Sequence, residues 1–174
     1  GKADRYSWDF DPRYDLFLAD PDGRLSPIAS AEGYDAEGSF SPDGRFVVFA
    51  SNRHAYQDGL SPEERERLVE DPSFFVDLYR LEFETGELIQ LTTSAGYDGG
   101  PFFSPDGGRI VWRRFSEDGA RAEILSMKAD GSDEHALTRL GVMSWAPFFH
   151  PSGEYVVFAT NRHGFDNFEL YLVD

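Results

Sequence analysis

The sequence predicts an all-β fold of antiparallel four-stranded β-propeller blades, present as an incomplete set. One core pattern recurs at residues 33–53, 96–114 and 142–162, each time as a short strand, a Pro-containing turn and an apolar strand. Self-similarity at a fixed period is the signature of a repeat architecture. Pro105 and Pro151 lie 46 positions apart, which suits a propeller blade of roughly 40–45 residues better than a helical repeat of about 34.

The strand pattern inside each repeat supports the same fold class. In the most regular repeat, strands are expected at residues 101–103, 110–113, 122–129 and 135–138. The turn after the first strand reads Ser-Pro-Asp-Gly, in which Pro presets φ and Gly accepts a positive φ. The second strand is β-branched and aromatic, a composition typical of sheets.

We expect one partial propeller domain over residues 1–174. Residues 1–30 hold the third and fourth strands of a blade, 33–93 a blade with an insertion, 96–139 a further blade, and 142–174 the first three strands of a last blade. Open strand edges are therefore expected at residues 14–20 and 168–174, and open edges recruit other strands. Two fates follow from this: the chain is a piece of a larger propeller, or it closes a ring by self-association through these edges.

The second repeat carries an insertion that predicts one short helix. Its proline-to-proline spacing is 63 instead of 46, and the 17 extra residues lie between Arg53 and Phe75. The helix is expected at about 61–71, with Ser61 as its N-cap and Glu64 completing a capping box. We expect it to lie over one propeller face, either as a structural cover or as a lid over a binding site.

Composition excludes several classes of function. Lys and Arg number 16 against 32 Asp and Glu, a net charge of −16. Such a charge disfavours nucleic acid and anionic membrane surfaces, which need clustered basic residues, and it permits cationic partners or Ca²⁺. The chain has no cysteine, so disulfides and thiolate metal sites are excluded. Because no apolar run approaches the ~18 residues of a membrane span, no membrane insertion is expected, and the first residues do not read as a signal peptide.

Acidic residues near the expected inner strands are candidate metal ligands. Tyr34-Asp35 and Tyr97-Asp98 lead into these strands, which line the central channel of a propeller. Asp35, Glu37 and Asp98 are hard oxygen ligands that suit Ca²⁺ at the channel mouth. The other interpretation is that each Asp caps its own turn. Tyr34 and Tyr97 are candidate binding residues beside these acids.

Arginines at the ends of the second strands form a further candidate group. Arg53 and Arg162 each follow an Asn, and each is expected to form a fork to Asp77 or Glu169 of its own blade. The functional alternative is a clamp on a substrate carboxylate. His163 follows Arg162 and is a candidate binding residue, in a position that indicates blade architecture and not a zinc site.

Catalytic motifs are not found in the sequence. It contains neither a G-x-S-x-G nucleophile elbow nor H-E-x-x-H spacing. Its Gly-Gly pair at 99–100 precedes an expected strand, whereas a phosphate-binding loop precedes a helix. We therefore expect no enzymatic activity, no catalytic residue, and no cofactor apart from the Ca²⁺ considered above.

The repeat also resembles a known family. FSPDG at 40–44 and 103–107, an apolar strand ending in SNR, and DLYRLE are similar to the PD40 (WD40-like) repeats of TolB-type β-propellers. The third copy departs from the pattern, with FHPSG at 149–153. The resemblance implies a propeller with six blades in the parent protein, a bacterial periplasmic or secreted location, and a non-catalytic scaffold that binds protein or peptide.

Two stretches resemble one kind of PD40 propeller in particular. GYDGGPFFSPDG and NRHGFDNFELYLVD are similar to the propellers that accompany M28-type peptidases. The alternative function that this implies is an accessory propeller of a secreted peptidase, M28-like or prolyl-oligopeptidase-like. Such a propeller would gate or orient substrate for a catalytic domain that this chain lacks.

Overall fold

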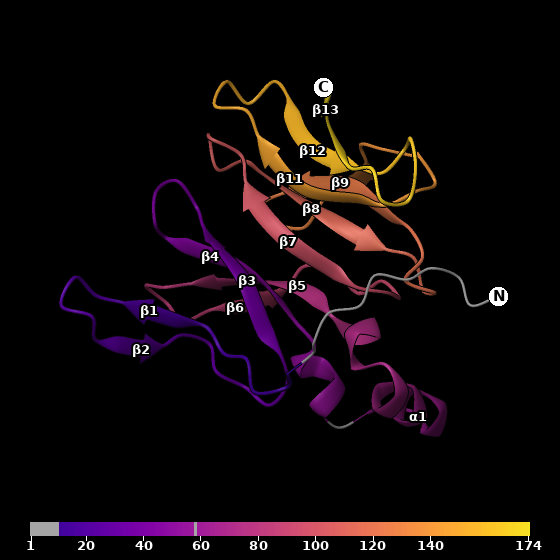
Figure 1. The fold of residues 1–174 in the computed structure, drawn as a ribbon. Coiled ribbons are helices and arrows are strands. Elements are labelled where there is room, and N and C mark those ends of the chain that lie inside the picture. The colour runs from indigo at the N-terminus through magenta and orange to yellow at the C-terminus, as the bar shows by residue number, and fades with distance from the viewer. Residues whose placement is uncertain (1–10, 58) are drawn as a thin grey trace.

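The computed structural model describes residues 11–57 and 59–174. The start of the first expected blade, residues 1–10, lies outside the described residues. The described strands form four antiparallel sheets, which follow one another in chain order from the indigo β1–β2 pair to the yellow β11–β13 sheet (Figure 1). The all-β fold class with antiparallel four-stranded blades is confirmed.

The bounds of the sheets are as follows. The first sheet pairs β1 (Phe17–Ala19) with β2 (Leu25–Pro27). The second has the order β3 (Asp35–Phe40), β4 (Phe46–Ser51), β5 (Asp77–Glu82) and β6 (Leu88–Gln90). The third has the order β7 (Asp98–Phe103), β8 (Arg109–Phe115), β9 (Ala122–Lys128) and β10 (His135–Ala136). The fourth has the order β11 (Ser144–Phe149), β12 (Val156–Thr160) and β13 (Glu169–Val173).

The inner strands begin earlier than the sequence predicted and each contains a bulge. These strands, β3, β7 and β11, start at the second residue of the Tyr-Asp or Met-Ser pair. The pairing of each with the next strand along the chain shifts its register once. One residue in each shift has a positive φ: Glu37 (56°), Gly100 (61°) and Ala146 (48°). A bulge adds a residue to one strand and bends it locally. The bulges therefore give the three inner strands a shared kink at equivalent positions.

The insertion forms three short helical segments: η1 (Arg53–Tyr56), α1 (Pro62–Glu70) and η2 (Pro72–Phe75). The predicted helix and its capping box are confirmed, since Glu64 N donates to Ser61 Oγ (3.2 Å) and Ser61 N donates to Glu64 Oε2 (2.7 Å). α1 projects away from the sheets (Figure 1) and none of its residues is buried. In the described part of the chain, no helix is both long and apolar enough to cross a bilayer.

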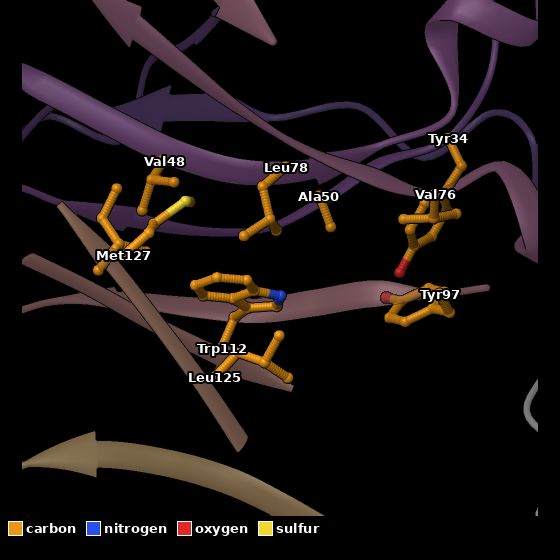
Figure 2. Packing of buried hydrophobic residues seen from close by; sticks show 10 residues of the cluster. Tyr34, Val48, Ala50, Val76, Leu78, Tyr97, Trp112, Leu125 and Met127 are labelled. Carbon is orange, nitrogen blue, oxygen red and sulfur yellow. The ribbon is translucent and has the colours of Figure 1, made fainter. Parts of the chain in front are cut away.

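Apolar side chains pack between consecutive sheets. Along β4, Val47 and Phe49 face the first sheet, whereas Val48 and Ala50 face the third. This alternation is the period of two that a strand imposes on its side chains. The largest cluster lies between the second and third sheets, where Trp112 packs beneath residues of β4 and β5 (Figure 2). Blade-on-blade packing thus fixes the position of each inner strand.

Candidate functional site

A pocket of about 460 Å³ lies where the second, third and fourth sheets meet the insertion. We call it the blade-junction pocket. Its lining combines aromatic rings, carboxylates and one guanidinium: Tyr34, Glu37, Asp71, Ser73, Phe74, Gly96, Tyr97, Arg113, Phe115, Ser116, Glu117, Gly119, Trp145 and Ala146. A concave site with apolar walls and a few convergent polar groups is the usual form of a ligand site.

Glu37 is the polar centre of this pocket. Its carboxylate accepts hydrogen bonds from Tyr97 Oη (2.7 Å), Gly100 N (2.8 Å) and Arg113 Nη2 (2.6 Å). All three donors belong to the third sheet or its lead-in, whereas Glu37 belongs to the second. The bulge in β3 gives Glu37 the left-handed backbone that lets its side chain cross between sheets. Glu37 therefore ties two blades together at the pocket.

Two glycines make this crossing sterically feasible. A Cβ on Gly99 would stand 2.1 Å from Tyr97 Cε1 and 2.4 Å from Glu37 Oε2. A Cβ on Gly100 would stand 2.2 Å from Arg113 Nη1, and Gly100 also has a positive φ. A residue without Cβ is required where another group approaches the backbone this closely. The Gly-Gly pair thus serves the Glu37 contact and not a phosphate.

Arg113 and Tyr97 are held in fixed states by their surroundings. The Arg113 guanidinium lies 5.4 Å from the centre of the Tyr97 ring and 5.8 Å from that of Phe115. Burial raises the pKa of Tyr97 well above its ordinary value, and the nearby charge of Glu37 adds to this. Tyr97 therefore stays protonated and keeps donating its hydrogen bond to Glu37.

The remaining aromatic walls come from the insertion and the fourth sheet. Phe74 of η2 lies under the guanidinium of Arg67, 4.4 Å from ring centre to Cζ. Trp145 of β11 stacks on Phe168 with ring centres 5.0 Å apart. Four lining residues were not predicted, because nothing in the sequence shows that the insertion and three blades converge: Arg113, Phe74, Phe115 and Trp145. The one sequence feature that could have indicated this site was the insertion, which contributes Phe74 to the lining.

The structure corrects the predicted partner of Arg53. Arg53 Nη2 lies 2.7 Å from Asp35 Oδ2, and both side chains are almost fully buried. It also donates to Ala29 O (2.5 Å), in the loop that follows β2. Ser51 of β4 lies between Asp35 of β3 and Asp77 of β5, and Arg53 pairs with Asp35, whereas Asp77 accepts hydrogen bonds from Gln90 and Thr92.

Asp98 forms the equivalent contact in the third sheet. Arg114 donates to both Asp98 oxygens, at 2.7 Å each, and Asp98 is fully buried. Arg114 also reaches Glu134 (2.6 Å). A bidentate fork of this kind is geometrically specific. Neither Asp35 nor Asp98 relies on capping its own turn, since each is paired with an arginine.

The three candidate calcium ligands are not gathered into one cluster. Asp35, Glu37 and Asp98 pair with Arg53, Arg113 and Arg114 respectively. Over residues 11–57 and 59–174, no group of three or more His, Cys, Asp or Glu side chains is placed to hold a metal ion. Calcium binding at these residues stays a prediction.

Arg162 and His163 lie outside the pocket lining and outside the strands of the fourth sheet. Both are exposed, in the turn between β12 and β13. The expected fork from Arg162 to Glu169 is replaced by an approach of His163 Nε2 to Glu169 Oε2 at 3.9 Å. The structure therefore brings Tyr34, Tyr97 and Glu37 to one site and leaves these two residues elsewhere.

The chain is similar in sequence to known proteins over part of its length. No family model matches the chain. An uncharacterized protein of Agrobacterium fabrum is 29% identical over 146 residues, which is 80% of this chain and 48% of that protein. A Tol-Pal system protein TolB of Francisella tularensis is 29% identical over 100 residues, which is 56% of this chain and 19% of that protein. The chain thus spans half or less of the length of these relatives.

Solved structures give the same fold. TolB from Acinetobacter baumannii superimposes with a TM-score of 0.68 at 21% identity, covering 92% of this chain and 35% of that one. An oligogalacturonate lyase in complex with manganese gives 0.63 at 18%, covering 93% and 42%. A puromycin-hydrolyzing peptidase of Mycobacterium tuberculosis gives 0.61 at 17%, covering 91% and 24%. The chain therefore has the fold of a TolB-like β-propeller and corresponds to part of one such propeller structure.

Proposed function

We propose that this chain is a non-catalytic scaffold that binds protein or peptide through the blade-junction pocket. The observation that carries the proposal is the pocket itself, with a volume of about 460 Å³. Its lining includes the rings of Phe74, Phe115 and Trp145 and the Glu37–Arg113 ion pair. Aromatic anchors around a few oriented polar groups are typical of protein-interaction sites. The likeness to TolB supports a protein partner, and a periplasmic or secreted location belongs to the same proposal.

A second candidate is an accessory propeller of a secreted peptidase. The likeness to the puromycin-hydrolyzing peptidase favours it. In this case the pocket would hold part of a peptide substrate and orient it toward a separate catalytic domain. Both candidates require a peptide-binding pocket and differ in what the parent protein does with the bound segment.

The test is an unbiased selection of random dodecapeptides displayed on phage, against the whole chain. Binders are then measured against the Trp145→Ala variant, which removes one wall of the pocket, and against Tyr155→Ala, which removes an exposed ring outside the pocket lining. We expect binders that lose affinity with Trp145→Ala and keep it with Tyr155→Ala. Binders that are insensitive to Trp145→Ala, or no binders, would count against the pocket as the site.

A further inference from the structure

We infer that the blade-junction pocket recognises the lysine or arginine side chain of a basic peptide segment. This inference rests on the proposed function and specifies the chemistry of its ligand. Four features point to a cationic side chain: the charge of the pocket lining, its aromatic rings, its dimensions, and the net charge of the whole chain.

The lining has more carboxylates than cations. Glu37, Asp71 and Glu117 contribute three carboxylates, against the single guanidinium of Arg113. Arg113 is paired with Glu37, whose Oε1 lies 2.6 Å from Arg113 Nη2. Arg67, which lies outside the lining, pairs with Asp71 (Nη2 to Oδ2, 3.9 Å), so Glu117 is the carboxylate that leaves the site net negative. Glu117 is exposed at the rim, beside the third sheet. A positive group entering the pocket would therefore meet net negative charge, whereas a carboxylate would be repelled.

The aromatic rings of the site already accept guanidinium groups. Arg113 lies over the rings of Tyr97 and Phe115, and Arg67 lies 4.4 Å from the centre of Phe74. The face of an aromatic ring is negative, and a cation within about 6 Å of the ring centre is attracted to it. An incoming lysine or arginine would find the same kind of environment along Trp145, which also lines the pocket.

The dimensions suit a long, amphipathic side chain. The volume of about 460 Å³ lies within the range of small-ligand pockets, roughly 300–1,000 Å³, and exceeds what one side chain occupies. Lysine and arginine carry apolar stems that pack on rings while their charged ends stay near polar groups. The stem would contact Phe115 and Trp145, and the charged end would approach Glu117.

The charge of the whole chain favours the same ligand. With a net charge of −16, the molecule attracts basic segments and repels acidic ones before contact. This long-range term is screened by salt, over a Debye length of about 10 Å at 0.1 M. The pocket contacts would then retain a basic side chain at one defined position.

Three labelled nonapeptides test the inference: Gly-Ser-Gly-Phe-Lys-Phe-Gly-Ser-Gly and the same sequence with Gln or Glu in place of Lys. Each is titrated with the whole chain at 50 mM NaCl and followed by fluorescence anisotropy. We expect the Lys peptide to bind about tenfold more tightly than the Gln peptide, with the Glu peptide weakest. Raising NaCl to 500 mM should reduce the preference.

Matched variants locate the binding. Trp145→Ala and Glu117→Gln should each weaken the Lys peptide several-fold, whereas Trp145→Phe, which keeps a ring, should retain most of the affinity. Glu154→Gln makes the same change of charge at an exposed turn outside the pocket lining and should stay within twofold of the unmodified chain. Thermal melting of each variant shows whether it folds.

Three results would overturn the inference, and they separate it from the proposed function. If Lys, Gln and Glu peptides bind equally and all depend on Trp145, the pocket binds peptides without a preference for cations, and only the ligand assignment fails. The same holds if Trp145-dependent binders from the display selection lack Lys and Arg. If neither the nonapeptides nor the selected binders depend on Trp145, the pocket is not the binding site and both proposals fail.

Discussion

At the residue scale, Asp77 is a buried carboxyl group that forms no ion pair with an arginine in the described part of the chain, and His54 Nδ1 lies 3.6 Å from its Oδ2. Asp77 accepts hydrogen bonds from Thr92 Oγ1 and Gln90 Nε2, each at 3.0 Å. Burial raises its pKa to about 7, and the neighbouring charge of Asp98 adds to the rise. Because the folded pKa exceeds the ordinary value of 3.8, the folded state binds this proton more tightly than the unfolded state does. Its contribution to stability is therefore full below about pH 4 and is lost as pH rises through about 7.

Asp77→Asn should remove this dependence on pH. At pH 8 we expect the variant to raise the free energy of unfolding by an amount on the order of 2–4 kcal/mol, since a neutral amide avoids the buried charge. At pH 3.5, below the ordinary pKa, the two proteins should be nearly equal, because Asp77 is then protonated in both the folded and the unfolded state. Denaturant unfolding at both pH values measures this difference, with Asp22→Asn in the exposed β1–β2 turn as the control for net charge. A variant that destabilises equally at both pH values would contradict the assignment.

The sequence identified the charged residues of the blades more readily than their partners. Asp35 and Arg53 were singled out separately, and β3–β4 pairing unites them in one buried contact. Arg113 was not among the candidate residues, yet it pairs with Glu37 across two blades. Contacts between blades depend on side-chain directions at bulges, and a strand pattern read from one repeat does not contain them.

At the scale of the element, the bulge in β7 depends on glycine at position 99. Gly99→Ala would force a Cβ to within 2.1 Å of the Tyr97 ring and 2.4 Å of Glu37 Oε2. We expect a loss of roughly 1–3 kcal/mol in the free energy of unfolding, the usual cost of overpacking. Gly108→Ala is the matched control, because the nearest contacts of its Cβ, at 3.4 Å from Asp106 oxygens, are ordinary. Chemical denaturation of both variants measures the difference, and equal stability would show that the Glu37 contact yields without cost.

The elements themselves were largely predictable. The capping box at Ser61 and Glu64 is local, since its partners lie three residues apart, and it forms as expected. The Ser-Pro-Asp-Gly turns are equally local: Ser41 Oγ donates to Asp43 Oδ1 and Ser104 Oγ to Asp106 Oδ1, both at 2.6 Å. The bulges in β3 and β11 were missed because the positive φ falls on Glu37 and Ala146, where no glycine indicates it.

At the scale of the whole molecule, the repeat period was enough to predict stacked antiparallel blades. What it could not predict was the pocket, because the insertion and three blades meet there only after the blades have stacked. Packing between blades nevertheless repeats from sheet to sheet. Leu78 of β5 pairs with Ala50 and is fully buried against the third sheet. Leu170 of β13 has the same position in the fourth sheet, where it pairs with Ala159.

This equivalence identifies an apolar face that no described residue covers. Leu170 and Leu172 are 76% and 67% exposed, and they pair with Ala159 and Val157 on the same face of the fourth sheet. A contiguous exposed apolar face next to an open strand edge favours association. We expect the isolated 174-residue chain to associate as its concentration rises.

Light scattering over a range of concentrations measures this association. The double variant Leu170→Glu/Leu172→Glu should shift the chain toward monomer, because two carboxylates on the face make its burial costly. Val69→Glu makes the same apolar-to-acidic change on α1, where Val69 is 86% exposed, and it should leave the mass unchanged. An unmodified chain that stays monomeric at every concentration would contradict the expectation. A discrete closed oligomer would favour ring closure by copies of this chain, whereas unlimited aggregation would favour a missing neighbour blade as the natural cover of Leu170 and Leu172.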